Sequence, residues 1–140
     1  MQTTSNILMI RPVAFGFNSQ TAESNAFQYK AEGENVQEKA LQEFNTFVNK
    51  LRLNHINVVV IEDTLQQHTP DSIFPNNWVS FHNDGSVYIY PMQAENRRME
   101  RRDDILDILS TQFNIKEIND LTFTEEKEEY LEGTGSMVLD

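Results

Sequence analysis

One acidic side chain, Glu132, lies in a glycine-rich stretch near the end of the printed sequence, LEGTGS. Gly133 and Gly135 allow the backbone to turn tightly or to approach a ligand closely, because glycine has no Cβ. Thr134 and Ser136 add hydroxyl groups that donate and accept hydrogen bonds. A phosphate-binding loop is not indicated, because the glycine spacing differs and no lysine follows. The stretch predicts either a loop that contacts a polar ligand through Glu132 or a solvated loop with an ordinary surface acid.

A second candidate for ligand binding is the stretch PDSIFPNNW, in which Pro75 precedes Asn76 and Asn77. Each asparagine offers a carbonyl acceptor and an NH2 donor, which suits a planar polar group such as a urea or a guanidinium. The alternative is that the pair forms a turn and caps the strand that follows, since asparagine after proline is common in turns.

The other polar residues predict structural roles. There is no cysteine, so this sequence offers no disulfide, no thiolate nucleophile and no cysteine-based metal site. The three histidines, His55, His68 and His82, lack the spacing of metal ligands, and we expect them to be surface or structural residues. The four arginines between residues 97 and 102 lie near acids at 95, 100, 103 and 104, which predicts a salt-bridged helix start or, alternatively, an anion or partner site. The acidic run at residues 125–129 predicts a solvated face.

Composition limits the possible functions. The 140 residues fit one domain, and the net charge of −11 argues against general binding to nucleic-acid phosphates. No apolar run reaches the length of a membrane span, and the first residues lack the pattern of a signal peptide. We therefore expect a soluble, cytoplasmic protein with no nucleic-acid or membrane partner.

The hydrophobic pattern alternates between strands and helices, which predicts the α/β class. Strands are expected at residues 6–12, at residues 55–63 (buried on both faces), and in a hairpin at 78–81 and 87–90. Helices are expected at 34–53 and 97–113, the second followed by a strand at 114–120 and an acidic connection that can hold a helical turn. Residues 78–119 thus form a predicted ββαβ unit.

A final strand, predicted at residues 137–139, would open a further unit whose other strands and helix are missing. An unpaired apolar edge strand promotes aggregation, so this pattern predicts that residues 1–140 are a piece of a larger domain. The alternative is that this strand pairs inside the present domain.

Four motifs in this order resemble one family: PVAFGFNSQTAESNAFQ, DSIFPNNWVSFH, DGSVYIYPMQAENRRMERR and YLEGTGSMVLD. They are similar to the pentein (guanidino-group-modifying) superfamily, in its amidinotransferase and citrulline-hydrolase-like branch. The resemblance implies an α/β propeller of ββαβ units around a polar central site. It also implies attack of a cysteine thiolate on the guanidino or ureido carbon of arginine, citrulline or a relative, with a histidine as acid and base and no cofactor. Water or an amine then resolves the covalent intermediate.

Carried over by motif, Glu132 falls on the family's catalytic acid. Asn77, or less well Asn76, falls where many relatives place an aspartate that binds the guanidinium, and an amide there favours a neutral ureido group. The remaining carried-over positions match the early loop that lines the substrate entrance: Phe17 and Asn18, with Asn25 as a weaker candidate.

The largest departure from the family is that its cysteine and its general-base histidine have no counterpart in this sequence. The resemblance therefore implies the N-terminal half of a pentein-type catalytic domain, residues 1–140, which is inactive without its missing C-terminal half. The alternative is a non-catalytic half-propeller that binds a guanidino compound or pairs with another chain, including a copy of itself.

Overall fold

The structure is a computed structural model that describes residues 4–22, 35–134 and 137. The chain forms two compact units, Met1–Phe74 and Pro75–Asp140. Both units contain strands and helices, so the predicted α/β class is confirmed. Within the described residues, every helix is too short or too polar to cross a bilayer.

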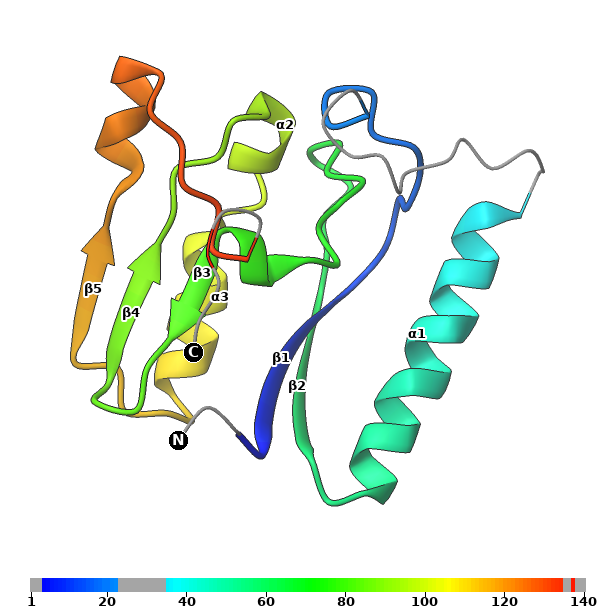
Figure 1. The fold of residues 1–140 in the computed structure, drawn as a ribbon. Helices are drawn as coiled ribbons and strands as arrows, with labels where there is room; N and C mark the ends of the chain where they lie inside the picture. The colour runs from blue at the N-terminus through cyan, green and yellow to red at the C-terminus, as the bar shows by residue number, and fades with distance from the viewer. Residues whose placement is uncertain (1–3, 23–34, 135–136, 138–140) are drawn as a thin grey trace. The chain divides into compact units, whose positions relative to one another are not determined.

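The first unit joins two parallel strands through a helix. β1 (Asn6–Arg11) pairs with β2 (Asn57–Glu62) from one end to the other, in register. Parallel neighbours require a crossover connection, and α1 (Val36–Leu53) supplies part of it. Figure 1 shows α1 running alongside the strand pair.

The core of the first unit lies between α1 and β2. Phe44 and Val48 of α1 pack against Val58 of β2, so the helix expected at residues 34–53 is confirmed and buries an apolar stripe on this side. The prediction that β2 is buried on both faces is wrong in part, because Val59 and Val60 are only partly buried. Among the described residues β2 pairs with β1 alone, so the middle of the strand keeps some contact with solvent.

The second unit contains the predicted ββαβ arrangement. β3 (Val79–Phe81) and β4 (Ser86–Ile89) form the antiparallel hairpin, and β5 (Glu117–Asp120) pairs in parallel with β4. The hairpin turn depends on Gly85, whose φ of +92° is unfavourable for residues with a Cβ. Asp84 stabilises the same turn by accepting hydrogen bonds from the amide and hydroxyl of Ser86.

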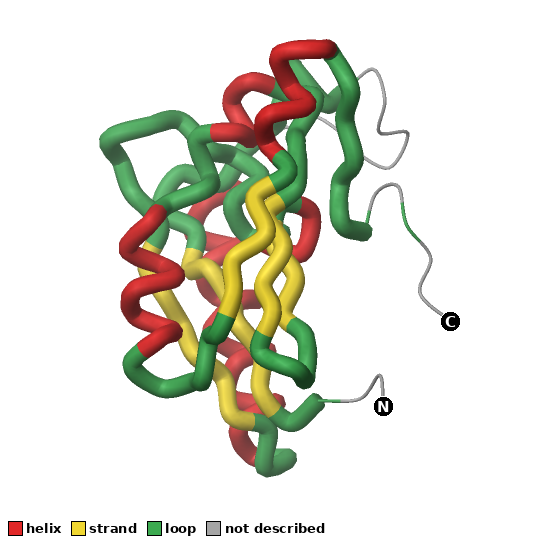
Figure 2. Tube along the Cα trace, turned by 90° about the vertical axis from the view of Figure 1, so that its left-hand side faces the viewer, coloured by secondary structure: helices red, strands yellow, loops and turns green. Residues whose placement is uncertain are grey.

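Helix α3 (Asp103–Ser110) covers one face of this three-stranded sheet, as Figures 1 and 2 show. Its Ile105 and Leu109 are buried, as are Val87 of β4 and the neighbouring Trp78 and Met92. Burial of this apolar surface is the main stabilising term for a unit of this size.

The prediction of one helix over residues 97–113 is wrong. The structure has a short helix α2 (Glu95–Arg98), a break, and then α3. At the break Arg102 is extended, and Arg98 and Arg101 donate hydrogen bonds to the backbone carbonyls of Met92 and Tyr90. These tertiary contacts outweigh the helical preference of the arginines, because propensity is a weak term.

The acidic connection contains the predicted helical turn, η2 (Thr122–Lys127). The prediction that residues 125–129 form a solvated face is wrong for Glu125, whose side chain is 12% exposed and is ion-paired with Arg101. The predicted last strand is not seen at Met137, which lies outside any strand, and Val138 and Leu139 lie outside the described residues.

Candidate functional site

Two stretches singled out in the sequence meet in the second unit. The side-chain amide nitrogen of Asn77 donates a hydrogen bond to Oε2 of Glu132 at 3.3 Å. Beside this contact, the side-chain amide nitrogen of Asn76 donates to the hydroxyl of Thr134. Asn76 and Asn77 belong to the short 3-10 helix η1 (Pro75–Asn77), which leads into the strand of the hairpin. The contact therefore holds the loop acid against the η1 turn.

Gly133 makes this contact possible. Its amide donates to the carbonyl of Asn77 at 2.7 Å. A Cβ added at Gly133 would lie 2.6 Å from the carbonyl oxygen of Asn76 and 3.0 Å from the ring of Tyr90. The close approach expected of a glycine at this position is thus to the protein's own backbone. Gly135 lies outside the described residues.

A cation adjoins the acid as well. The guanidinium of Arg97 lies 3.9 Å from Oε2 of Glu132. The same guanidinium forms a two-pronged ion pair with Glu100, at 3.0 and 3.1 Å, and both side chains are buried. No pattern in the sequence indicated the contact with Glu132. The three-residue spacing of Arg97 and Glu100 indicated only the local pair.

Glu132 therefore has a neutral amide donor on one side and a cation on another. A carboxylate can accept several hydrogen bonds at once, including those from N–H donors of a ligand. This arrangement suits a planar polar group with several N–H bonds.

Asn18 and Phe17 lie in the first unit. Asn18 is 1% exposed, and its amide nitrogen donates to Oδ2 of Asp71 at 2.7 Å. Thr21 donates to the same carboxylate oxygen at 3.1 Å. Phe17 is 40% exposed. A role for Phe17 and Asn18 at a substrate entrance stays a prediction, and Asn25 lies outside the described residues.

A polar cluster in the first unit was not predicted from the sequence. Asp63, directly after β2, accepts a hydrogen bond from the hydroxyl of Ser72 at 2.6 Å and another from Thr69 at 3.1 Å. Thr69 and Ser72 are both buried. The cluster orders a loop that the sequence presented only as long and interrupted by prolines. An acid after a strand, followed by hydroxyl residues, was the available signal.

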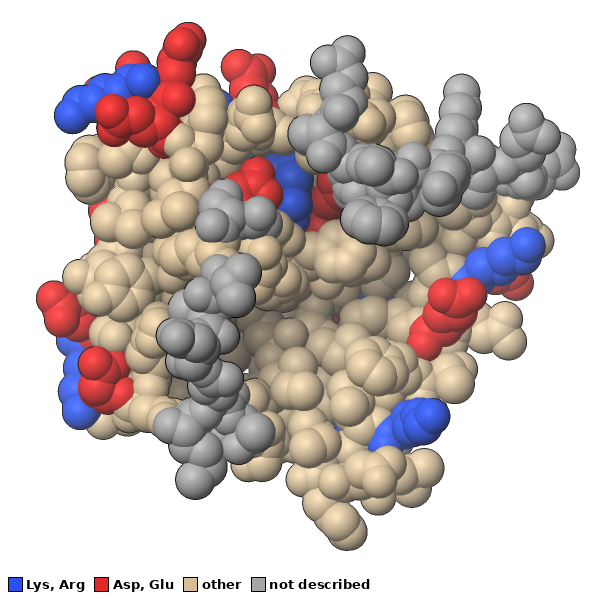
Figure 3. All heavy atoms as spheres, viewed as in Figure 1, with Lys and Arg blue, Asp and Glu red and all other residues tan. Residues whose placement is uncertain are grey.

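The histidines have the surface positions that were expected. His55, His68 and His82 are exposed. His82 shares a hydrogen bond of 2.9 Å with the hydroxyl of Ser80. In the part of the chain that the structure describes, no cluster of histidines and acids is suited to holding a metal ion. On the face drawn in Figure 3, acidic and basic side chains lie beside one another in small groups, without an extended basic patch.

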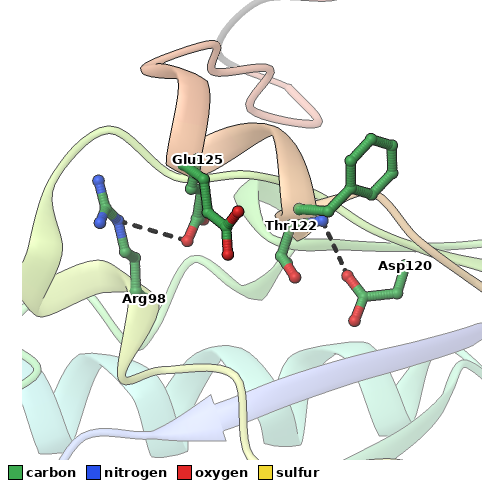
Figure 4. A pocket seen from close by; sticks show the side chains of 6 residues that line it. Arg98, Asp120, Thr122 and Glu125 are labelled. Carbon is green, nitrogen blue, oxygen red and sulfur yellow. Dashed lines mark hydrogen bonds and ion pairs between the residues drawn. The ribbon is translucent and has the colours of Figure 1, made fainter.

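A pocket of about 490 Å³ lies elsewhere in the second unit, lined by Arg98, Asp120, Thr122, Phe123, Glu125 and Glu126. Figure 4 shows that its polar groups already bond to one another: Arg98 pairs with Glu125, and Asp120 accepts from the amide of Thr122. Asn77 and Glu132 are not part of its lining. The pocket therefore does not coincide with the site predicted from the sequence.

The chain is similar to known proteins over most of its length. A family model described as N,N dimethylarginine dimethylhydrolase, eukaryotic, matches residues 11–140. A solved dimethylarginine dimethylaminohydrolase in adduct with S-methyl-L-thiocitrulline has a TM-score of 0.63 and 17% identity, with 96% of this chain and 46% of that chain covered. A Pseudomonas aeruginosa variant complexed with citrulline has a TM-score of 0.56 and 18% identity, with coverages of 82% and 40%. No curated protein matches the sequence.

The solved structures establish the fold, and they confirm that the chain has part of the pentein propeller fold predicted from the sequence. The chain spans less than half the length of these structures.

Proposed function

The chain belongs to the N,N-dimethylarginine dimethylhydrolase family, within the pentein superfamily, and on this premise we propose that it is the N-terminal half of a hydrolase domain. The enzyme would cleave a C–N bond of a methylated arginine or a related guanidino or ureido amino acid. The observation that carries this proposal is the contact of Glu132 with Asn77, because it holds one carboxylate against the η1 turn in the matched segment.

Glu132 would bind the N–H groups of the substrate's guanidino or ureido head. Charge-assisted hydrogen bonds of this type are shorter and stronger than neutral ones. Asn77 would hold the carboxylate in place through its amide nitrogen, and its carbonyl oxygen stays available as an acceptor. The same carboxylate would orient a general-base histidine that follows in the rest of the domain.

The nucleophile has to come from outside these residues, because the sequence contains no cysteine. A thiolate supplied by the rest of the domain would attack the central carbon of the head group and release an amine. Water would then resolve the covalent intermediate. Transfer to a second amine is the alternative outcome of the same chemistry, and product analysis distinguishes the two.

The substrate class follows from the same groups. The solved relatives hold citrulline and an S-methyl-L-thiocitrulline adduct, both with planar nitrogen-bearing heads. Here the turn beside the acid carries the neutral amides of Asn76 and Asn77, which suits an uncharged ureido head at least as well as a charged guanidinium.

A second candidate function is binding without turnover, which the absence of cysteine favours for this chain by itself. Calorimetric titration of the chain with citrulline and with dimethylarginine separates the two. Binding without product in the chain, and product formation only when the rest of the domain is present, would support the hydrolase proposal.

The decisive experiment replaces Glu132 by glutamine in the intact protein. We expect kcat to fall by about 10²-fold or more, because a positioned acid or base contributes about 10²–10⁴-fold. Citrulline and released amine are measured together, and tryptophan fluorescence checks the fold. Glu129→Gln is the matched control, because Glu129 is an exposed acid on the same segment. Equal turnover in both variants would reject the proposed role of Glu132.

A further inference from the structure

Glu125 differs from the other acids of its run in its contacts. Its carboxylate accepts two hydrogen bonds from the guanidinium of Arg101 and one from the backbone amide of Met92 at 2.7 Å. Arg98 adds an ion pair at 3.5 Å, drawn in Figure 4, and also lies over the ring of Tyr130 at 5.6 Å. Glu125 thus fastens η2 to the segment that follows β4.

The charged form of Glu125 is favoured by these partners. Desolvation raises the pKa of its carboxyl group. The hydrogen bonds from Arg101 and Met92, with the positive charges of Arg101 and Arg98, lower the pKa by more than desolvation raises it, so the pKa lies below its usual value. The acids that follow, at 126, 128 and 129, are exposed. The ion pair is therefore a specific contact of one member of the run.

The chain between Glu125 and Glu132 returns along the same segment. The amide of Leu131 donates to the carbonyl of Pro91 at 3.1 Å, one residue from the amide that Glu125 binds. Glu132 alone separates Leu131 from Gly133, and the backbone amide of Gly133 donates to the carbonyl of Asn77 in η1. The segment that carries Glu132 is consequently attached at two amides, and the ion pair of Glu125 anchors the same segment upstream.

We propose that Glu125 and Arg101 are positioning residues for Glu132: their ion pair holds the returning segment against the Pro91–Met92 backbone, so that the acid reaches Asn77. An effect of the ion pair on catalysis rests on the proposed function, whereas its effect on the attachment of the segment does not. Glu125 and Arg101 do not touch the substrate, and they act through the backbone that they hold.

Amide hydrogen exchange tests the segment without reference to activity. In Glu125→Gln and in Arg101→Lys, we expect the amides of Leu131 and Gly133 to exchange about tenfold faster or more, because a charge-assisted pair is lost or loses its forked geometry. Arg102→Lys is the matched control. Its guanidinium pairs with the nearby Asp104, whose carboxylate is mostly exposed, so the substitution changes a surface ion pair away from the returning segment.

The amide of Lys116, which donates to the carbonyl of Gly85 at the hairpin turn, serves as the internal reference. Faster exchange at Leu131 and Gly133 with unchanged exchange at Lys116 supports the proposal. Equal acceleration at all three amides would mean a general loss of stability and would overturn it, as would unchanged exchange at Leu131 and Gly133.

Kinetics of the intact protein give the second readout. We expect Glu125→Gln to lower kcat about tenfold with KM changed less, and the double variant with Glu132→Gln to lose no more than Glu132→Gln alone. An additive loss in the double variant would contradict the idea that Glu125 acts through Glu132. Absence of turnover in the wild-type protein would refute the proposed function, and the exchange experiment would still decide the positioning role.

Discussion

Replacing Gly133 by alanine should detach the loop that carries the candidate acid. The added Cβ would lie 2.6 Å from the carbonyl oxygen of Asn76 and 3.0 and 3.1 Å from ring carbons of Tyr90. The nearest atom belongs to the backbone of η1, and the ring is buried, so neither neighbour moves at low cost. The loop must therefore shift, which breaks the bond from the Gly133 amide to Asn77 and draws Glu132 away.

The size of the effect follows from two terms. Overpacking costs about 1–3 kcal/mol, and a lost hydrogen bond costs about 0.5–1.5 kcal/mol. Because a shift of the loop relieves the overpacking while it breaks the hydrogen bond, we expect the free energy of unfolding of the second unit to fall by about 2 kcal/mol. With a urea slope of about 1–3 kcal/mol/M, the midpoint should move down by about 1 M.

The assay is urea unfolding followed by fluorescence of Trp78. It is the sole tryptophan of the sequence, it is 1% exposed, and it directly follows Asn77. Its emission therefore reports on the unit that contains the loop. In the intact protein, the proposed function adds a fall in kcat of the same order as that of Glu132→Gln.

The control is Gly16→Ala, because a Cβ at Gly16 meets no atom within 4 Å. Since Gly16 lies in the first unit, unfolding of both variants is also followed by circular dichroism, which reports on both units. We expect that variant to change stability by no more than about 0.5 kcal/mol, or to stabilise slightly through the unfolded chain. A midpoint for Gly133→Ala equal to that of the wild type would refute the close approach of Gly133 to Asn76. An equal loss of stability in the two variants would show that replacing glycine by alanine is destabilising in general and not through the contact at Gly133.

Three further outcomes are expected. Folding lowers the pKa of Glu125, so its charged form stabilises the folded protein above the unfolded pKa near 4.5, and this stabilisation is lost as pH falls. Glu125→Gln should therefore flatten the acid side of a plot of urea midpoint against pH. An unchanged slope would contradict this expectation. Ser72→Ala should lower the free energy of unfolding by about 1 kcal/mol or more, since it removes the 2.6 Å hydrogen bond to Asp63; thermal unfolding measures it. Asn77→Asp would place a second carboxylate beside Glu132 and should raise the ratio of kcat/KM for guanidino over ureido substrates in the intact protein, and an unchanged ratio would mean that Asn77 does not meet the reacting group.

The elements that the sequence predicted well are those whose pattern is local. The stripe of α1 and the hairpin around Asp84 and Gly85 follow from side-chain period and turn chemistry within a few residues. The break between α2 and α3 could not be predicted in this way, because it depends on arginines that reach carbonyl groups of a different segment, such as Tyr90 and Met92. For the same reason Glu125 was assigned to a solvated face.

The site shows the same limit. Asn77 and Glu132 were selected because of their motifs, and no spacing rule places side chains 55 residues apart in contact. The bond between them depends on the ββαβ topology, which brings the segment after β5 back to the turn before β3. Arg97 was assigned to a local helix pair, and its position beside Glu132 follows from the same return of the chain.

The charges around Glu132 constrain the substrate more than the composition of the chain does. The net charge of −11 by itself suggests an affinity for cations. At the acid, however, the guanidinium of Arg97 lies 3.9 Å away and the neighbouring side chain is the neutral amide of Asn77. Because Arg97 is itself paired with Glu100, the three side chains Arg97, Glu100 and Glu132 together keep one negative charge. On the proposed function, a guanidinium head would gain from that charge, whereas a ureido head would use only the acceptors of Glu132 and Asn77 for its N–H groups. Raising the salt concentration should therefore weaken the binding of a guanidinium head more than that of a ureido head, since screening acts on charge and leaves neutral hydrogen bonds almost unchanged.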